Sequence, residues 1–142
     1  RNITTNKRII LMIHTIISPL FVMIPRKTKA SKRISLNMNT YRNLHHRTSN
    51  DAKKEYTRVV SEQLVNLDIK TPVEITYKVY KASNRRLDKM NVVSVVSKFL
   101  LDAITEYGCW EDDNDIHVKT ETILPTELDR VNPRVEVIIK EI

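Results

Sequence analysis

The sequence contains very little glycine and cysteine: among its 142 residues there is one of each, Gly108 and Cys109. The glycine-rich loops that cradle the phosphates of dinucleotides and nucleoside triphosphates each need at least two glycines within a short motif. We therefore expect no nucleotide cofactor. A single cysteine cannot form a disulfide within the chain, so nothing in the sequence indicates an oxidising compartment, and we expect a cytoplasmic protein.

The sequence also lacks an apolar stretch long enough to span a membrane. A membrane-spanning helix needs about 20 apolar residues, whereas the apolar run at residues 9–24 contains His14 and is interrupted by Pro19. The run has no small-residue cleavage site of the kind that ends a signal peptide. We expect a buried strand at residues 20–24, and we regard residues 1–18 as an N-terminal extension of uncertain order. Membrane attachment through this run is a third interpretation, behind the two given below.

The remaining composition is that of an ordinary globular domain. Hydrophobic residues make up 41% of the sequence and charged residues 29%. A chain of this size buries about 68–70% of its unfolded surface and needs neither disulfides nor a metal to fold. We therefore predict one domain, at residues 19–142.

Hydrophobic periodicity predicts the main elements of this domain. Helical spacing of apolar residues predicts one helix from Ser49 or Asn50 to about residue 67, and a second at residues 89–107 that Gly108 ends. Alternation of apolar and polar residues predicts three strands, at residues 73–80, 116–124 and 134–141. In the second strand we expect the even-numbered residues, such as Val118, Thr120 and Thr122, to share a face. These elements favour an α/β (α+β) fold in which a small mixed sheet packs with two main helices.

Charge is unevenly distributed along the chain, whose formal net charge is +7. Residues 26–54 contain nine basic residues and one acidic residue, whereas residues 106–142 contain ten acidic and four basic residues. The basic part indicates a polyanionic partner such as nucleic acid. The acidic part must have a different function, such as binding a cation. A solvated basic surface with an acidic tail is an alternative that charge counts leave open.

The candidate contacts to nucleic acid lie in two basic segments. Residues 26–50 are polar, basic and without periodicity, and we interpret them as a long loop of the kind that carries function. Arginine and lysine supply most contacts to the phosphates of nucleic acids. The candidate DNA-binding residues are Arg33, Arg42, Arg47, Arg85 and Arg86.

The predicted helix at residues 89–107 carries a narrow polar stripe. At about 3.6 residues per turn, Asp88, Asn91, Lys98 and Asp102 fall on one line of the helix surface, beside a broad apolar face. Four acidic residues follow the helix within five positions: Glu111, Asp112, Asp113 and Asp115. Crowded carboxylates raise one another's pKa values unless a cation relieves them, and carboxylate oxygens suit hard ions such as Mg²⁺ and Mn²⁺.

A metal site on these residues has a geometric condition. Asp88 and Asp113 would suffice for Mg²⁺, which often takes only one or two protein carboxylates. The helix between them is about 30 Å long, at about 1.5 Å per residue, so they meet only if the loop folds back or if two chains lie antiparallel. The alternative is a solvated acidic turn with an ordinary ion pair between Lys98 and Asp102.

The same residues resemble the RusA-like Holliday-junction resolvases, and in particular their phage-type members. The resemblance lies in the segments RRLDKMN (residues 85–91), KFLLDAI (98–104) and GCWEDD (108–113), and it extends to NPRVEV (132–137). Met90 stands where the family usually has a second aspartate. The interval from Asn91 to Lys98 is longer than in short members by about four residues, roughly one helical turn.

The resemblance implies a homodimeric, Mg²⁺-dependent endodeoxyribonuclease, with Mn²⁺ able to substitute. It would cut four-way junctions or other branched DNA in recombination and repair, in the cytoplasm of a host cell if a bacteriophage encodes it. The resemblance assigns metal binding to Asp88, Asp112 and Asp113, catalysis to Asp88, Lys98 and Asp113, and supporting roles to Asn91 and Asp102. Water would attack the phosphate in line, and Lys98 would stabilise the developing charge. The alternative is a non-catalytic, basic nucleic-acid-binding module whose acidic residues cap a helix or contact a partner.

Overall fold

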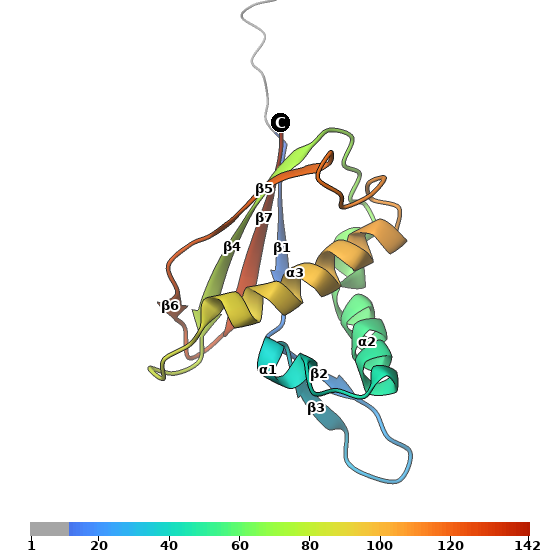
Figure 1. Cartoon of the computed structure of the whole chain (residues 1–142), viewed down its shortest axis with the longest axis vertical. Coiled ribbons are helices and arrows are strands. Elements are labelled where there is room, and N and C mark those ends of the chain that lie inside the picture. Colours follow the sequence, from blue (N-terminus) through green and yellow to red (C-terminus); the bar gives the residue numbers. More distant parts are fainter. Residues whose placement is uncertain (1–11) are drawn as a thin grey trace, which may run out of the picture.

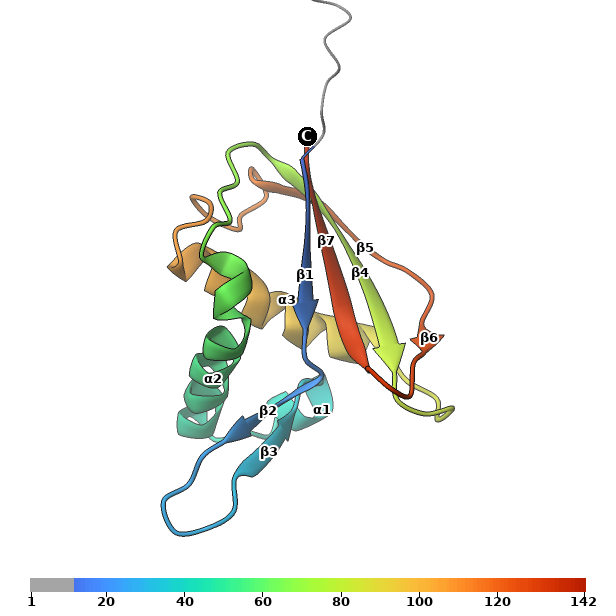
Figure 2. The same ribbon diagram turned by 180° about the vertical axis from the view of Figure 1, so that it is seen from behind.

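The computed structural model describes residues 12–142, which form a single α+β domain with a mixed sheet. The sheet runs in the order β1 (Ile13–Ser18), β7 (Arg134–Glu141), β4 (Val73–Lys81) and β5 (Val118–Ile123). β7 is antiparallel to both of its neighbours, whereas β5 and the short β6 (Glu127–Leu128) are parallel to β4. Figures 1 and 2 show the sheet as one twisted layer from opposite sides. The expected fold class is therefore confirmed at the level of a mixed sheet with two main helices.

One face of the sheet is buried because apolar residues alternate along its central strands. Ile16, Val137 and Tyr77 lie directly opposite one another across β1, β7 and β4, and each is at most 2% exposed. Opposite residues on neighbouring strands share a face, so these three side chains point to the same side. The predicted faces of the strands at residues 73–80 and 134–141 are thereby confirmed.

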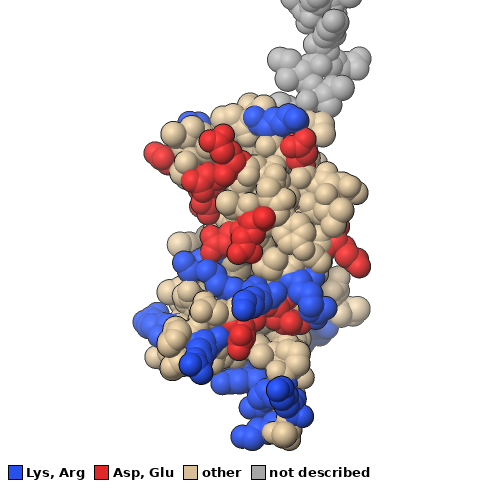
Figure 3. All heavy atoms as spheres, turned by 90° about the vertical axis from the view of Figure 1, so that its right-hand side faces the viewer, with Lys and Arg blue, Asp and Glu red and all other residues tan. Residues whose placement is uncertain are grey.

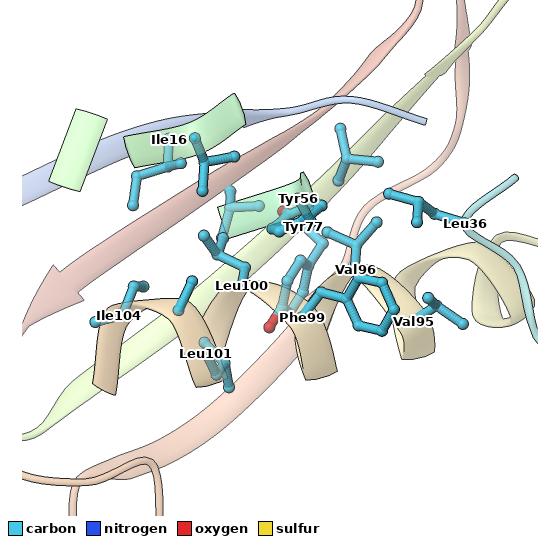
Figure 4. Close-up of a cluster of buried hydrophobic side chains, with 14 of the residues drawn as sticks. Ile16, Leu36, Tyr56, Tyr77, Val95, Val96, Phe99, Leu100, Leu101 and Ile104 are labelled. Carbon is cyan, nitrogen blue, oxygen red and sulfur yellow. The ribbon is translucent and has the colours of Figure 1, made fainter. Parts of the chain in front are cut away.

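Two long helices, α2 (His46–Leu64) and α3 (Lys89–Glu106), cover this face. Figure 4 shows Phe99, Leu100 and Ile104 of α3 packed toward Tyr56 of α2 and Tyr77 of β4. The ring of Phe99 meets that of Tyr56 edge-on, with centroids 5.6 Å apart. Burial of each large apolar side chain contributes roughly 1.5–3 kcal/mol, so this interface fixes the axis of α3 on the sheet.

The segment expected to be a long loop contains regular structure. β2 (Phe21–Ile24) pairs with β3 (Lys32–Ser35) in a separate two-stranded ribbon, and α1 (Met38–Tyr41) follows. Helix α2 begins at His46, before the predicted Ser49, because Nδ1 of His45 accepts a hydrogen bond from the Arg47 N–H and caps the helix. The loop prediction for residues 26–50 was thus wrong for much of its length.

The N-terminal limit of the domain also differs from the expected one. Residues 13–18, which we assigned to an extension, form β1 at the edge of the sheet, and the remaining residues 1–11 lie outside the described part. The edge of β1 is covered at one point by a side chain: the Gln63 amide accepts from the Ile17 N–H at 2.7 Å and donates to the Ile17 carbonyl at 2.9 Å. Of the helices within residues 12–142, none combines the length and apolar character that crossing a membrane would need.

β5 carries the other departure from the predicted pattern. The pairing with β4 shifts by one residue, since Val73 pairs with Val118 but Glu74 pairs with Thr120. A bulge of this kind reverses the faces that follow it. Ile123, not Thr122, therefore packs against the core together with Val118.

Candidate functional site

Helix α3 holds the predicted site residues at its two opposite ends. Asp88 is the N-cap: its Oδ1 accepts from the N–H groups of Met90 at 3.1 Å and Asn91 at 3.4 Å, and the residue is exposed. Asp113 follows the other end of the helix. The 18 residues of α3 span about 27 Å at about 1.5 Å per residue. The structure therefore does not bring Asp88 and Asp113 together within one chain.

Helix α3 ends just before Gly108, as predicted, and the turn at this residue builds a pocket beside the last turns of the helix. Gly108 has φ +71°, a conformation that glycine adopts without steric cost. Trp110 is then buried against the helix, where its indole N–H donates to Oγ1 of Thr105 at 2.7 Å. The loop after Trp110 consequently folds back toward α3 and places Asp112 and Asp113 beside Asp102.

The resulting acidic pocket has a volume of about 290 Å³. It is lined by side chains from α2, from α3 and from the loop, namely Lys53, Phe99, Asp102, Thr105, Glu106, Asp112 and Asp113. Lys53 Nζ lies 3.1 Å from Oδ2 of Asp102. Three of the residues named from the sequence, Asp102, Asp112 and Asp113, thus share one hollow with a lysine.

The electrostatics of the acidic pocket favour a bound cation. Burial raises the pKa of Asp113, and a hydrogen bond with Asp112 and the negative charges of Asp102 and Asp112 raise it further. A carboxylate in this setting is relieved by a positive charge. Lys53 supplies part of that charge at Asp102.

The carboxylates of the acidic pocket fit only a metal site that has few protein ligands. Within residues 12–142, no group of three or more His, Cys, Asp or Glu side chains is arranged to hold a metal ion. Mg²⁺ is commonly bound by one or two carboxylates and several waters, and Asp112 and Asp113 can supply that donor set. A full protein cage of ligands is absent from the part of the chain that the structure describes.

Lys98, the remaining catalytic candidate, and Asn91, which was assigned a supporting role, both lie on α3. Lys98 is exposed and stands one turn before Asp102 on the same helix. Asn91 belongs to the opposite end, where it lines a second hollow of about 170 Å³ together with Asp88, Arg86 and Asn37. The narrow polar stripe predicted on the helix is thus divided: Asp102 lines the acidic pocket, Asp88 and Asn91 line the second hollow, and Lys98 lines neither.

The candidate DNA-binding arginines are all exposed, but they belong to different elements. Arg33 lies in β3, Arg42 follows α1, and Arg47 lies in the first turn of α2. Arg85 and Arg86 lie in the segment that leads into α3. Figure 3 shows that Lys and Arg gather on the lower part of one face, while Asp and Glu gather above them.

Two features of the region escaped the sequence analysis. Lys53 was not among the predicted site residues, and its contact with Asp102 depends on how α2 crosses α3, which local sequence does not encode. Glu121 accepts hydrogen bonds from the Tyr77 hydroxyl and, at 2.9 Å, from Oγ of Ser97. The bulge in β5 turns Glu121 toward α3, and the alternation of residues 116–124 gave no sign of it.

No model of a protein family matches the chain, and no curated protein matches it either.

Proposed function

We propose that this protein is a metal-dependent endonuclease that cleaves Holliday junctions or other branched DNA by hydrolysis. The observation that supports this most strongly is the acidic pocket, in which Asp102, Asp112 and Asp113 share a hollow with Lys53. On one face of the molecule, basic side chains gather on the lower part and acidic side chains lie mostly above them (Figure 3). Metal-dependent hydrolysis of DNA uses both kinds of group: carboxylates to hold a hard cation, and basic side chains to hold the DNA backbone.

The side chains take the following roles in this proposal. Asp112 and Asp113 hold a Mg²⁺ ion, for which Mn²⁺ can substitute, and Asp102 adds negative charge near them. When bound, the ion would lower the pKa of a water molecule and neutralise charge on the scissile phosphate. Lys98, exposed one turn before Asp102, stabilises the charge that develops on the phosphate oxygens. Arg33, Arg42, Arg47, Arg85 and Arg86 contact the DNA of the junction arms.

Asp88 enters the site only from a second copy of the chain. Since Asp88 and Asp113 stand at opposite ends of α3, two copies with their α3 helices antiparallel would bring Asp88 of one copy toward Asp113 of the other. We therefore propose a homodimer with two shared sites. Only Oδ1 of the exposed Asp88 carboxylate accepts the hydrogen bonds that cap α3. Oδ2 would therefore be the oxygen that contacts the site of the second copy.

The first experiment tests the site by single substitutions. Asp113→Asn should abolish Mg²⁺-dependent cutting of a synthetic four-way junction while junction binding persists. Asp88→Asn should do the same and still fold, because asparagine caps helices as well as aspartate. Asp115→Asn, an exposed acid of the same loop, is the control that should cut normally. Retained cutting in both Asp88→Asn and Asp113→Asn would refute the assignment.

The second experiment tests the shared sites by mixing the two inactive variants. In a mixed dimer of Asp88→Asn and Asp113→Asn subunits, one site carries both changes and the other carries neither. Nicking of the junction should therefore reappear on mixing. No recovery, with mixed dimers demonstrated by a tag on one subunit, would show that Asp88 and Asp113 do not act across two chains.

A non-catalytic nucleic-acid-binding module is the second candidate. It is favoured by the structural partners that two of the acids already have: Asp88 caps α3 and Asp102 is paired with Lys53. A titration with Mg²⁺ separates the candidates. An enzyme yields nicked products that depend on the metal, whereas a binding module only changes the mobility of the junction.

A further inference from the structure

The β2–β3 ribbon projects from the body of the molecule, at the end opposite to the C-terminus (Figures 1 and 2). Its base is firmly anchored, because Val22, Ile34 and the adjoining Leu36 are at most 3% exposed within the core. The Leu36 N–H also donates to the Leu20 carbonyl at 2.9 Å. The ribbon is therefore a projection whose base is fixed on the core.

The projecting end of the ribbon is strongly basic. Five cations, Arg26, Lys27, Lys29, Lys32 and Arg33, lie in the turn and in β3, and the sequence contains no acidic residue before Asp51. Nε of Arg26 donates to the Ala30 carbonyl at 2.8 Å and closes the turn. None of the ion pairs among residues 12–142 involves these five cations. Their positive charge is thus available to an anionic partner.

The outward face of the ribbon combines apolar and basic groups. Phe21 and Met23, which alternate with the buried Val22, are 36% and 42% exposed. Met23 pairs with Arg33 across the ribbon, and the Arg33 guanidinium lies 3.8 Å from the centre of the Phe21 ring. One face therefore offers an aromatic ring, a thioether and a guanidinium side by side.

From this arrangement we propose that the β2–β3 ribbon enters the major groove of a double-stranded DNA arm. The inference rests on the proposed function, since it takes DNA as the substrate. The major groove of B-form DNA is about 12 Å wide and admits a two-stranded ribbon, whereas the minor groove is about 6 Å wide. Lys27 and Lys29 at the turn reach the phosphates that border the groove. Arg33 and Met23 face the base edges, where arginine pairs with guanine and apolar groups contact thymine methyls.

The position of the ribbon connects it to the acidic pocket through α2. Ile24 and Pro25, where β2 leads into the turn, line a hollow with residues of α2, namely Asp51, Lys54, Glu55 and Arg58. Two of these are acidic: Glu55 is paired with Arg58, whereas Asp51 lines the hollow together with Ile24 and Pro25, next to the basic turn. Lys53, on the same turn of α2, belongs to the acidic pocket. A duplex held by the ribbon would therefore lie along the helix that borders the proposed site.

The proposal is tested by a double variant at the turn, Lys27→Gln/Lys29→Gln. Its matched control is Lys70→Gln/Lys119→Gln, which removes two exposed lysines outside the ribbon. Binding to a four-way junction is measured with Ca²⁺ in place of Mg²⁺, between 50 and 200 mM salt. The slope of log affinity against log salt should fall by about 1.8 in the turn variant, since each lost phosphate contact removes about 0.9. The control should keep the slope of the unmodified protein.

Two further measurements identify the groove. The unmodified protein should protect guanine N7, a major-groove atom, from methylation, and Arg33→Gln should lose that protection. Double-stranded RNA of the same sequence should compete poorly, because its major groove is too deep and narrow to admit side chains. Unchanged affinity and slope in the turn variant, unprotected N7 atoms, or competition by RNA equal to that by DNA would each overturn the proposal.

These outcomes separate the ribbon from the nuclease. If the junction is bound through the ribbon but never cut, the groove proposal stands and the enzyme proposal fails. If the junction is cut equally well by the turn variant, with unchanged binding, the enzyme stands and the ribbon proposal fails. Absence of any DNA binding by the unmodified protein would overturn both.

Discussion

The Lys53 ammonium on α2 lies 3.1 Å from the Asp102 carboxylate on α3, and this ion pair ties the two helices together at the edge of the acidic pocket. Both side chains are partly exposed, at 33% and 44%, so the pair contributes only about 0.2–1 kcal/mol to stability. The larger effect of Lys53 is to neutralise part of the negative charge of the acidic pocket. Lys53 acts as a built-in counter-ion that competes with any metal ion in the pocket.

We therefore predict that Lys53→Gln binds Mn²⁺ more tightly than the unmodified protein, and that Asp102→Asn binds it more weakly. Mn²⁺ titration monitored by electron paramagnetic resonance measures both changes. Lys54→Gln, the neighbouring lysine that faces the hollow beside the ribbon, should leave the affinity unchanged. Weaker Mn²⁺ binding in Lys53→Gln would contradict the counter-ion role.

The raised pKa of Asp113 predicts how stability depends on pH. Burial, the hydrogen bond with Asp112 and the nearby negative charges make the folded state hold the proton of Asp113 more strongly than the unfolded state does. Stability therefore falls as pH rises from the ordinary value of 3.8 through the raised folded pKa. Without metal, Asp113→Asn should be more stable than the unmodified protein at pH 7. Denaturant titrations at a series of pH values should show this difference vanish below pH 3.8. A less stable Asp113→Asn at pH 7 would be the opposite result.

A buried hydrogen bond between Tyr56 and Ser18 gives a prediction about the core. The Tyr56 hydroxyl donates to Oγ of Ser18 at 2.7 Å, and Oγ of Ser18 donates in turn to the Pro19 carbonyl at 3.0 Å. Tyr56→Phe should cost about 0.5–1.5 kcal/mol, because Ser18 keeps its own acceptor. Ser18→Ala leaves the fully buried tyrosine hydroxyl without a partner and should cost more, about 1–3 kcal/mol. Urea unfolding of the two variants measures both losses. A smaller loss in Ser18→Ala than in Tyr56→Phe would contradict the prediction, and would indicate that a water molecule bonds the Tyr56 hydroxyl in place of Ser18.

The turn at Gly108 gives a prediction about backbone conformation alone. A Cβ atom added at Gly108 meets no other atom within 4 Å, so a substitution there changes φ preference and little else. Gly108→Ala should lower the unfolding free energy by about 1–2 kcal/mol. Gly108→Asn should lower it less, since asparagine adopts positive φ more readily than alanine. Equal losses in the two variants would indicate that something other than the φ of +71° controls the turn.

Elements with a complete local pattern were predictable from the sequence. The bounds of β7 and α3 follow from strict alternation at Val135, Val137 and Ile139 and from a wide apolar face that ends at Gly108. β5 was found, but its faces were wrong, because the bulge after Val118 depends on pairing with β4. The strand expected at residues 20–24 is present as β2, although Val22 is its only buried residue. Its partner β3 was missed because lysine and arginine occupy the positions where an apolar alternation would have revealed it.

The candidate site was predictable only in part, for a related reason. The sequence identified Asp102, Asp112 and Asp113, and the turn at Gly108 brings them into one pocket. It did not indicate Lys53, which arrives from a separate helix. Asp88 remains about 27 Å away at the other end of α3, by the rise per residue of a helix, and its role stays a prediction that requires a second chain.

The side-chain amide of Gln63 bonds both backbone groups of Ile17 at the edge of β1, and this affects how other copies of the protein can contact that edge. An open strand edge is a template on which another molecule's strand can add, and repeated addition builds fibrils. A neighbour that approached β1 at Ile17 would first have to displace both hydrogen bonds of the amide. Gln63 therefore protects this part of the β1 edge against the addition of a strand from another molecule.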